Sequence, residues 1–517
     1  MAGETYSEIT FAEALEIVEA GEIVEFKYIV DAERVHDFTF KSHVRFSNCD
    51  FTALDLSGCR FDKGFAFVGC IFEGRVSFEG ARAASDCHFR ACTFNKEARF
   101  DRLRVDGKLE VRAPRNTLPL KGNRHRNSAN GRELQLPPYV TFKEHVNFPQ
   151  IFVTGEANFG SAQFCNGVDF YNARIEGPAF FRKDSCREYQ EGNKTIGFAD
   201  ELFKPTRFGA KKTRDPDVRV RFRDAFFGGE LNFYRATFEC LADFSYVRCQ
   251  GMAFFCNPRA LHDTLDNESC EFEQAVDFEG ARFANSLRLD KCRFSGTEQV
   301  RFQDCRVTET LAFGDVPEKL CMTGCSYKRL QCSKPDDYPE AIKRYEDTKN
   351  QFDRSSWIQL EATLRNSGSL NFADRVYRQR MCQERKHALS VVQRAFSYLW
   401  QGISGFGTSQ RGLIAVCLVV LATGIPVFYT GSLKKSSKET PAASCVSQSF
   451  DSAAAVSLYY FSPLKLPVAE DCTPDGWRNW FAAFEKITGW ILVPLLAANL
   501  TGLLHRKAKS KLEASDE

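Results

Sequence analysis

The sequence lacks the motifs by which many soluble enzymes are recognised. It holds no glycine-rich loop that would cradle a phosphate and no nucleophile elbow. Its eight histidines are scattered without the spacing of metal ligands. We therefore predict that the protein is not an enzyme, and we expect no catalytic residue, no metal site and no cofactor.

An excess of charge of either sign is also missing, because 69 basic residues stand against 67 acidic ones. This balance gives no support to a nucleic-acid partner, and we expect none. Basic side chains do gather in two segments, 112–138 and 187–219, which we interpret as solvated loops. A patch for nucleic acid or lipid headgroups is the alternative. The basic residues in question are Arg124, Arg126, Arg132, Lys211, Lys212 and Arg214.

Methionine is scarce, with four residues, whereas phenylalanine occurs 48 times. This composition indicates a core of stacked rings, because aromatic pairs attract one another beyond the effect of area burial. Bulky residues recur at separations that alternate between six and five. The longest uninterrupted series is Phe61, Phe67, Phe72, Phe78, Ala83, Phe89, Phe94, Phe100, Val105 and Val111.

The spacing defines an eleven-residue unit made of two short faces. A small or slim residue, such as Ala81 or Cys92, stands two positions before most of the bulky ones. One bulky and one small side chain then point inward on each face, which fits neither a 3.6-residue helix nor a long alternating strand. The pattern predicts a stacked solenoid from which segments 112–138 and 187–219 leave as loops.

Several units carry a small residue, then Asp or Asn, then a large apolar residue, as in Ala157-Asn158-Phe159, Val168-Asp169-Phe170 and Ala242-Asp243-Phe244. Here the chain resembles the pentapeptide-repeat family. Over residues 38–330 the resemblance implies a right-handed quadrilateral parallel β-helix of about nine coils, and we expect a helical cap over residues 1–37. The resemblance says little about function. Family members that resemble DNA bind topoisomerases through an acidic surface, which the charge balance does not support.

Twenty cysteines suggest at first a disulfide framework, but their positions argue otherwise. Cys87, Cys92, Cys270 and Cys292 occupy the small inward position, where a thiol acts as a compact apolar group. The first residues are polar and acidic, unlike a secretory signal, so we expect a reducing cytosol for the solenoid. The group Cys321, Cys325 and Cys332 lacks paired C-x-x-C spacing, and we do not expect zinc there.

Two stretches near the C-terminus, 412–429 and 487–504, contain no charged residue. Each has 18 residues, about the minimum for crossing a hydrocarbon core of ~30 Å. We predict a multi-pass protein of the inner (plasma) membrane of a bacterium. Basic residues flank the two spans and favour a cytoplasmic location for both termini, although Lys434, Lys435 and Lys438 between the spans weaken this count. The flanking residues are Arg385, Lys386, Arg394 and Arg411 before the first span and His505, Arg506, Lys507, Lys509 and Lys511 after the second. We expect a charged tail over residues 509–517.

A helical linker is predicted over residues 331–400. Segments 339–352 and 370–384 have helical patterns, and Val391 to Trp400 would form an apolar face that lies in the membrane interface. The stripe formed by Ala373, Val376, Tyr377 and Met381 is typical of ordinary helix packing. In a channel, the same linker would transmit movement from the solenoid to the pore.

The segment between the spans has the features of a re-entrant helix over residues 450–461, too short to cross a bilayer. A span, a half-helix, an irregular stretch and a second span follow one another in two-helix pore modules. Over about residues 340–508 the chain resembles bacterial pentapeptide-repeat proteins with a potassium-channel-like pore. The residues that carry this resemblance include Gly405-Phe406-Gly407-Thr408, Ser457 to Ser462, Pro474-x-Gly476-Trp477 and Ala482-x-x-Glu485-x-x-x-Gly489.

The resemblance implies a pore-like domain over residues 401–508 that assembles as a homo-oligomer, most simply a tetramer. The filter motif of the family, Thr-x-Gly-Tyr-Gly, is replaced by the stretch from Pro463 to Glu470. Two prolines and no glycine cannot reproduce a ring of carbonyls that selects potassium. We therefore predict a pore without potassium selectivity.

Candidate filter residues are Ser462, Lys465, Glu470 and Asp471. A ring of Lys465 would favour anions and a ring of acids would favour cations, unless these are merely exposed loop charges. Gly489 and Pro494 are places where the second span can bend. Asn499 and Thr501 would line the pore or hold helices together. Cys445 and Cys472 would form a disulfide if their compartment is oxidising.

We thus predict a homo-oligomeric ion channel or pore with a cytosolic β-helix that serves as sensor or scaffold. Its partners would be the lipid bilayer, small permeant ions, further copies of the chain and a possible protein partner on the β-helix. The alternative is a membrane-anchored interaction scaffold that does not conduct.

Overall fold

The computed structural model describes most of the 517 residues, and the chain divides into two compact units, 1–356 and 357–517, which we treat separately. The described residues are 7–30, 35–113, 124–126, 133–135, 139–182, 189–191, 194–196, 206–209, 219–256, 270–290, 292–295, 299–332, 337–387, 390–404, 410–429, 433–435, 450–462, 472–474 and 476–500.

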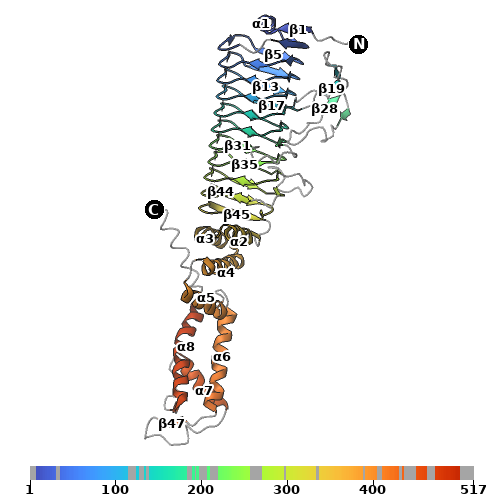
Figure 1. The fold of residues 1–517 in the computed structure, drawn as a ribbon. Coiled ribbons are helices and arrows are strands. Elements are labelled where there is room, and N and C mark those ends of the chain that lie inside the picture. Colours follow the sequence, from blue (N-terminus) through green and yellow to red (C-terminus); the bar gives the residue numbers. More distant parts are fainter. Residues whose placement is uncertain are drawn as a thin grey trace. The chain divides into compact units, whose positions relative to one another are not determined.

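The first unit is a parallel β-helix, and the predicted solenoid is confirmed (Figure 1). Most of its strands are short, and each pairs in register with the strand one coil away. Ile71 lies opposite Asp50 on one side and Thr93 on the other, so these coils contain 21 and 22 residues. The backbone hydrogen bonds of one coil are therefore satisfied by its neighbours.

The strands form three ladders that run the length of the unit. The first ladder contains β1 (Ser7–Thr10), β3 (Lys27–Val30), β6 (Asp50–Phe51), β10 (Ile71–Phe72), β14 (Thr93–Phe94), β20 (Thr141–Phe142), β24 (Gln163–Phe164), β30 (Arg207–Phe208), β34 (Thr237–Phe238), β38 (Glu271–Phe272) and β42 (Arg293–Phe294). The second contains β7 (Leu54–Asp55), β11 (Val76–Ser77), β15 (Ala98–Arg99), β21 (Val146–Asn147), β25 (Val168–Asp169), β31 (Arg219–Arg221), β35 (Leu241–Asp243), β39 (Val276–Asp277), β43 (Gln299–Arg301) and β45 (Lys319–Cys321).

The third ladder contributes two rows of strands. One row is β4 (Thr39–Phe40), β8 (Arg60–Phe61), β12 (Arg82–Ala83), β16 (Arg104–Val105), β22 (Phe152–Val153), β26 (Arg174–Ile175), β32 (Phe226–Phe227), β36 (Arg248–Cys249) and β40 (Arg282–Phe283). The other is β2 (Val24–Glu25), β5 (Val44–Ser47), β9 (Phe65–Val68), β13 (Cys87–Arg90), β17 (Leu109–Arg112), β23 (Ala157–Asn158), β27 (Ala179–Phe180), β33 (Leu231–Asn232), β37 (Ala253–Phe254) and β41 (Leu287–Leu289). The long strands β44 (Arg306–Phe313) and β46 (Ser326–Cys332) extend both rows.

The core is a set of stacked phenylalanine rings. In the first ladder, neighbouring rings from Phe51 to Phe294 lie 4.5 to 5.5 Å apart between centroids. The stack also crosses the first insertion, because Phe94 lies 4.5 Å from Phe142. The predicted ring core is therefore continuous along the β-helix.

The ends of the β-helix differ from the sequence-based expectation. The N-terminal segment contains one helix, α1 (Phe11–Glu19), and three strands rather than a helical cap alone. A capping box starts α1, because Thr10 Oγ1 accepts from the backbone N–H of Glu13 and Glu13 Oε2 accepts from that of Thr10. The first ladder has eleven strands: nine of them, β6 to β42, lie within residues 38–330, as predicted, and β1 and β3 precede them. At the other end, α2 (Asp337–Lys349) covers the last coil, and its Tyr338 ring lies 5.4 Å from that of Phe313.

Two segments leave the coils, as expected, but the second is shorter than predicted. Strand β30 lies within 187–219 and returns to the first ladder beside β24 and β34. The first insertion contains the antiparallel pair β18 (Arg124–Arg126) and β19 (Glu133–Gln135), and the second contains β28 (Tyr189–Glu191) and β29 (Lys194–Ile196).

One outward row of the third ladder is basic at seven of nine stacked positions, which the balanced net charge conceals. The stacked positions are Arg60, Arg82, Arg104, Phe152, Arg174, Phe226, Arg248, Arg282 and Arg306. Arg60, Arg104 and Arg174 pair with an acid two residues further on. Arg248, Arg282 and Arg306 follow one another with no ion pair among the described residues. Like charges directly opposite one another on parallel strands destabilise a sheet.

The second unit is helical. It contains α3 (Arg354–Asn366), α4 (Leu370–His387), α5 (Val391–Ser404), α6 (Gln410–Tyr429), α7 (Phe450–Phe461) and α8 (Trp477–Leu500), with the antiparallel pair β47 (Leu433–Lys435) and β48 (Cys472–Pro474). Helix α3 was not anticipated. Helix α5 exposes Val391, Val392 and Phe396, as an interfacial helix would.

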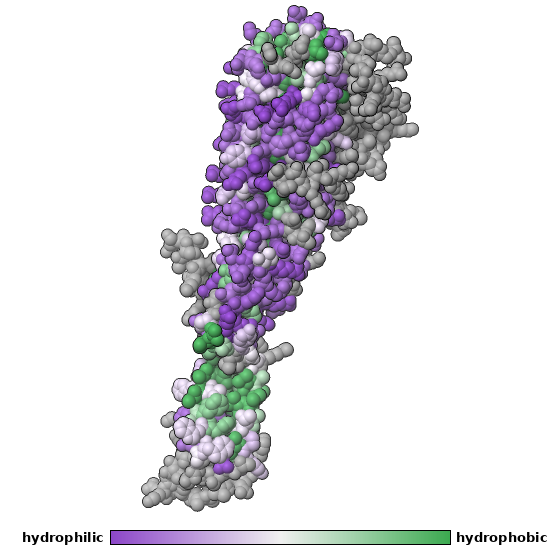
Figure 2. Space-filling model, in the orientation of Figure 1, coloured by the Kyte–Doolittle hydropathy of each residue, from purple (hydrophilic) through white to green (hydrophobic). Residues whose placement is uncertain are grey.

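Two helices of this unit are long and apolar enough to cross a membrane. The candidate spans are Gly412–Tyr429 in α6 and Trp477–Ala497 in α8, with mean hydropathies of 2.3 and 1.3. In the hydropathy colouring of Figure 2, the outer surface of these helices is largely apolar, whereas that of the β-helix is largely hydrophilic. Helix α8 begins ten residues before the predicted span at residue 487.

The ring stack makes the β-helix sensitive to the loss of one buried ring. Phe233 is fully buried and stacks on Phe181 and Phe255 at 4.9 and 4.8 Å. We expect Phe233→Ala to destabilise the unit by about 3–5 kcal/mol in chemical denaturation. Loss of hydrogen-exchange protection should be strongest in the adjacent coils, because each coil contacts only its neighbours. Tyr171→Ala, at a ring that is 40% exposed, is the control and should cost less than about 1 kcal/mol; equal effects would contradict the ring-stack account.

Repulsion along the basic row gives a second prediction. Arg282→Gln should stabilise the β-helix by about 0.2–1 kcal/mol at ~0.01 M salt, and the gain should vanish at ~1 M salt because exposed charges are screened there. Arg174→Gln is the matched control, since Arg174 pairs with Glu176 at 2.6 Å and stands over the Phe226 ring. This control should lose stability, and a similar gain in both variants would show that repulsion is not the cause.

Candidate functional site

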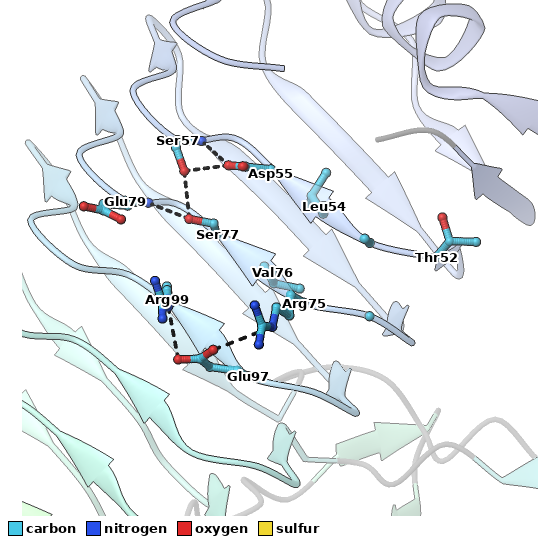
Figure 3. A pocket seen from close by; sticks show the side chains of 12 residues that line it. Thr52, Leu54, Asp55, Ser57, Arg75, Val76, Ser77, Glu79, Glu97 and Arg99 are labelled. Atoms are coloured by element: carbon cyan, nitrogen blue, oxygen red, sulfur yellow. Dashed lines mark hydrogen bonds and ion pairs between the residues drawn. The ribbon is translucent and has the colours of Figure 1, made fainter. Parts of the chain in front are cut away.

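A shallow pocket of about 500 Å³ lies on the second ladder of the β-helix (Figure 3). Its polar side chains are engaged with one another. Glu97 pairs with Arg99 at 3.0 Å and with Arg75 at 3.8 Å, and Ser57 Oγ lies 2.5 Å from Asp55 Oδ1 and 2.7 Å from Ser77 Oγ. No buried polar atom without a hydrogen-bond partner lines it, as far as the described residues show. The pocket offers little to a ligand, and we place the candidate site in the helical unit.

The centre of the helical unit is the packing of α7 against both long helices. At one end of α7, Phe461 is buried with Leu413 and Cys417 of α6 and Leu492 of α8. At the other end, Ala453 and Val456 are buried with Phe428 of α6 and Ala482 of α8. Helix α7 has 12 residues, a rise of about 18 Å, so it cannot cross a bilayer alone.

Two glycines allow the helices to approach one another this closely. A Cβ at Gly489 of α8 would overlap the backbone carbonyl of Phe461, where α7 ends. A Cβ at Gly424 of α6 would overlap the carboxylate of Glu485 and the hydroxyl of Ser457. A side chain at position 489 must therefore push α7 and α8 apart, whereas one at position 424 must displace the side chains of Glu485 and Ser457.

A carboxyl group lies at the point where the three helices meet. Glu485 of α8 is fully buried, and its Oε1 lies 2.7 Å from Ser457 Oγ of α7. Ser457 Oγ also lies 3.3 Å from the carbonyl oxygen of Leu421 in α6. The second carboxyl oxygen, Glu485 Oε2, is buried and has no hydrogen-bond partner among the described residues. An ionisable group in this position is costly and marks a functional site more often than a structural one.

The outer faces of α6 and α8 carry large exposed apolar side chains. They are Ile414, Leu418 and Val419 of α6 and Trp477, Trp480, Phe484, Ile487, Trp490 and Ile491 of α8. A single chain leaves this area uncovered, which suits lipid or further copies of the chain. At the α7 N-terminal end of the bundle, Arg478 Nε donates to the carbonyl of Val427 at 3.1 Å.

The predicted site residues are only partly placed. Gly489 lies in the contact with α7, and α8 continues without a break through Gly489 and Pro494. Ser462 follows α7 directly and is half-buried. Lys465, Glu470, Asp471, Thr501 and Cys445 lie outside the described residues, as do the side chains of Asn499 and Cys472.

Sequence reasoning named Glu485 and Ser457 only as parts of motifs and did not bring them together. The uncharged run that defined the second span begins at residue 487, so Glu485 was placed outside it. Gly424 was not singled out at all. The signal that was available is a glycine within an otherwise bulky apolar span, which often marks close helix contact.

Thiols and acids do not form a metal centre in the part of the chain that the structure describes. The inward cysteines are buried as predicted, and burial raises the pKa of Cys87 and Cys292 well above the ordinary value. Such thiols act as apolar core groups rather than as metal ligands or nucleophiles.

Comparison with known proteins supports the β-helix alone. A family model described as pentapeptide repeats (9 copies) matches residues 268–317. No curated protein and no solved structure matches the chain. The helical unit lies outside the matched residues, so its function must be argued from its own geometry.

The contact at Gly489 predicts a strong effect of one methyl group. Gly489→Ala should lower the stability of the helical unit by about 1–3 kcal/mol, because the Cβ meets a backbone carbonyl that cannot rotate away. Thermal unfolding in detergent, followed by helical circular dichroism, measures the loss. Gly402→Ala in α5 is the control, since nothing lies near its Cβ and alanine favours a helix. An unchanged transition in Gly489→Ala would contradict the packing described.

Proposed function

We propose that the protein is a homo-oligomeric ion channel or pore of the bacterial inner membrane, with its β-helix as a cytosolic sensor or scaffold. The observation that carries the proposal is the short helix α7, packed between two helices long enough to span a bilayer. The order of elements is that of the potassium-channel-like pore modules that the sequence resembles.

The depth at which α7 ends supports a pore. Gly489 contacts the end of α7 and lies 12 residues, or about 18 Å, along the 24-residue helix α8. If α8 spans the bilayer, α7 ends near its middle. In membrane proteins a helix end in that position is either buried in protein or lines a water-filled path, and we propose the second for the assembled copies.

The same geometry favours cations. The carbonyl end of a helix carries a partial negative charge, and in α7 this end lies near the middle of the candidate span. The filter sequence of potassium channels is absent, so we propose a cation preference without potassium selectivity. A ring of Lys465 would give the opposite preference.

One chain cannot enclose a path. The exposed apolar faces of α6 and α8 provide surface both for lipid and for neighbouring copies, and four copies around an axis are the simplest arrangement. Basic residues that precede α6 and follow α8 in the sequence favour cytoplasmic termini.

A second candidate function is a membrane-anchored scaffold that does not conduct. It is favoured by the family match, which covers repeats alone, and by the departure from the filter motif. We propose neither an enzymatic activity nor a nucleic-acid partner under either function.

Purified full-length protein in planar bilayers should conduct, and its reversal potential under a salt gradient should indicate cations. Subunit counting in detergent should give an oligomer.

Lys465→Glu should raise the cation preference if this residue faces the path. Lys343→Glu in α2 is the control for a charge change elsewhere and should leave the preference unchanged. A silent, monomeric preparation would leave the anchored scaffold, and an anion-selective reversal potential would overturn the argument from α7.

A further inference from the structure

The Ser457 side chain has one hydroxyl proton and contacts two oxygen atoms that can accept it. Its single hydroxyl proton lies within reach of two acceptors, Glu485 Oε1 at 2.7 Å and the Leu421 carbonyl oxygen at 3.3 Å. A serine hydroxyl donates only one hydrogen bond but accepts up to two. If Glu485 is ionised, the single Ser457 proton can be donated to the carboxylate or to the Leu421 carbonyl, but not to both.

A protonated Glu485 removes the conflict. Its O–H then donates to Ser457 Oγ, and the Ser457 O–H donates to the Leu421 carbonyl. This arrangement links α8 to α7 and α7 to α6 through one chain of hydrogen bonds. It also explains why Glu485 Oε2 is buried without a partner, since a neutral carboxyl loses much less by burial than a carboxylate does.

Among the described residues, no cation lies beside Glu485 that would compensate for a buried carboxylate. From α6, Leu421 and Gly424 face the site, and the span Gly412–Tyr429 contains no charged residue. From α7 the near groups are Ser457 and the neutral rings of Tyr459 and Tyr460, whereas Asp451 is exposed six residues away. From α8, Lys486 is exposed, and Arg478 is seven residues, or about 10 Å, along the helix and is bonded to Val427. Glu485 has no ion pair within the described residues.

We propose that Glu485 and Ser457 form a proton-binding site that joins α7 to the two long helices. In the packed arrangement the carboxyl holds a proton at neutral pH. Loss of this proton to water leaves a carboxylate that accepts the Ser457 O–H, so the hydrogen bond from Ser457 to Leu421 is lost and the apolar contacts of α7 with α6 remain. The site stands on geometry alone; its effect on conduction rests in addition on the proposed pore function.

A hydrophobic carbodiimide tests the site on the wild-type protein, because this reagent adds to protonated carboxyl groups in apolar surroundings. We expect mass spectrometry to find Glu485 modified at neutral pH, with labelling that falls at alkaline pH. The exposed carboxylate of Asp451 is the internal control and should remain unmodified at neutral pH. No labelling of Glu485, or equal labelling of both residues, overturns the proposal.

Glu485→Gln provides the matched variant, because an amide keeps a donor for Ser457 and cannot ionise. Its helical unit should keep the wild-type stability measured at low pH and lose the decline toward alkaline pH, whereas Asp451→Asn should keep that decline. Equal pH dependence of stability in Glu485→Gln and the wild type overturns the proposal.

In bilayers, Glu485→Gln should abolish the pH dependence of conductance. Carbodiimide labelling without any conductance would retain the proton site and reject the pore, whereas conductance without labelling would do the reverse.

Discussion

The distance between neighbouring parallel strands determines the distance between side chains that occupy equivalent positions in successive coils. That distance is about 4.8 Å, and it coincides with the separation at which aromatic rings stack well. The β-helix depends on this coincidence, since rings 4.5 to 5.5 Å apart fill its core from Phe51 to Phe294. A smaller side chain at these positions would leave cavities between coils, and a bulkier one would clash with its neighbours. The abundance of phenylalanine follows from the geometry of the backbone.

The same repeat acts on the surface, where it brings like charges together. Over several coils an arginine lies opposite the arginine of the next, as in Arg82–Arg104 and Arg248–Arg282, although acids elsewhere balance the total charge. In the helical unit the close approach is achieved differently, with glycines at positions 424 and 489 that let helices meet without a repeated spacing. The β-helix thus packs densely by repeating one spacing, whereas the helical unit packs densely through individual glycine contacts.

The sequence allowed much of this to be predicted, because the Phe spacing and the uncharged runs are local signals. The bounds of α6 and α7 fall close to the predicted 412–429 and 450–461. Four-residue strands near the N-terminus carry no recognisable pattern, so β1 and β3 were missed. The arginine row was hidden because insertions change the separation of stacked positions from 22 residues, as between Arg82 and Arg104, to 48 between Arg104 and Phe152. Gly424 and Glu485 meet only through folding, 61 residues apart, and no local pattern connects them.

The buried carboxyl separates the two candidate functions on physical grounds. An anchor has only to hold two apolar helices in lipid, and an apolar side chain at position 485 would do so without the cost of burying a polar group. Neither a third helix nor a hydrogen bond between helices is needed for that purpose. The observed arrangement uses a glycine, a serine and a glutamate for one contact between the sides of three helices. In the proposed proton site this contact has two states that differ by one proton, and two states are what a gated path requires and a passive anchor does not.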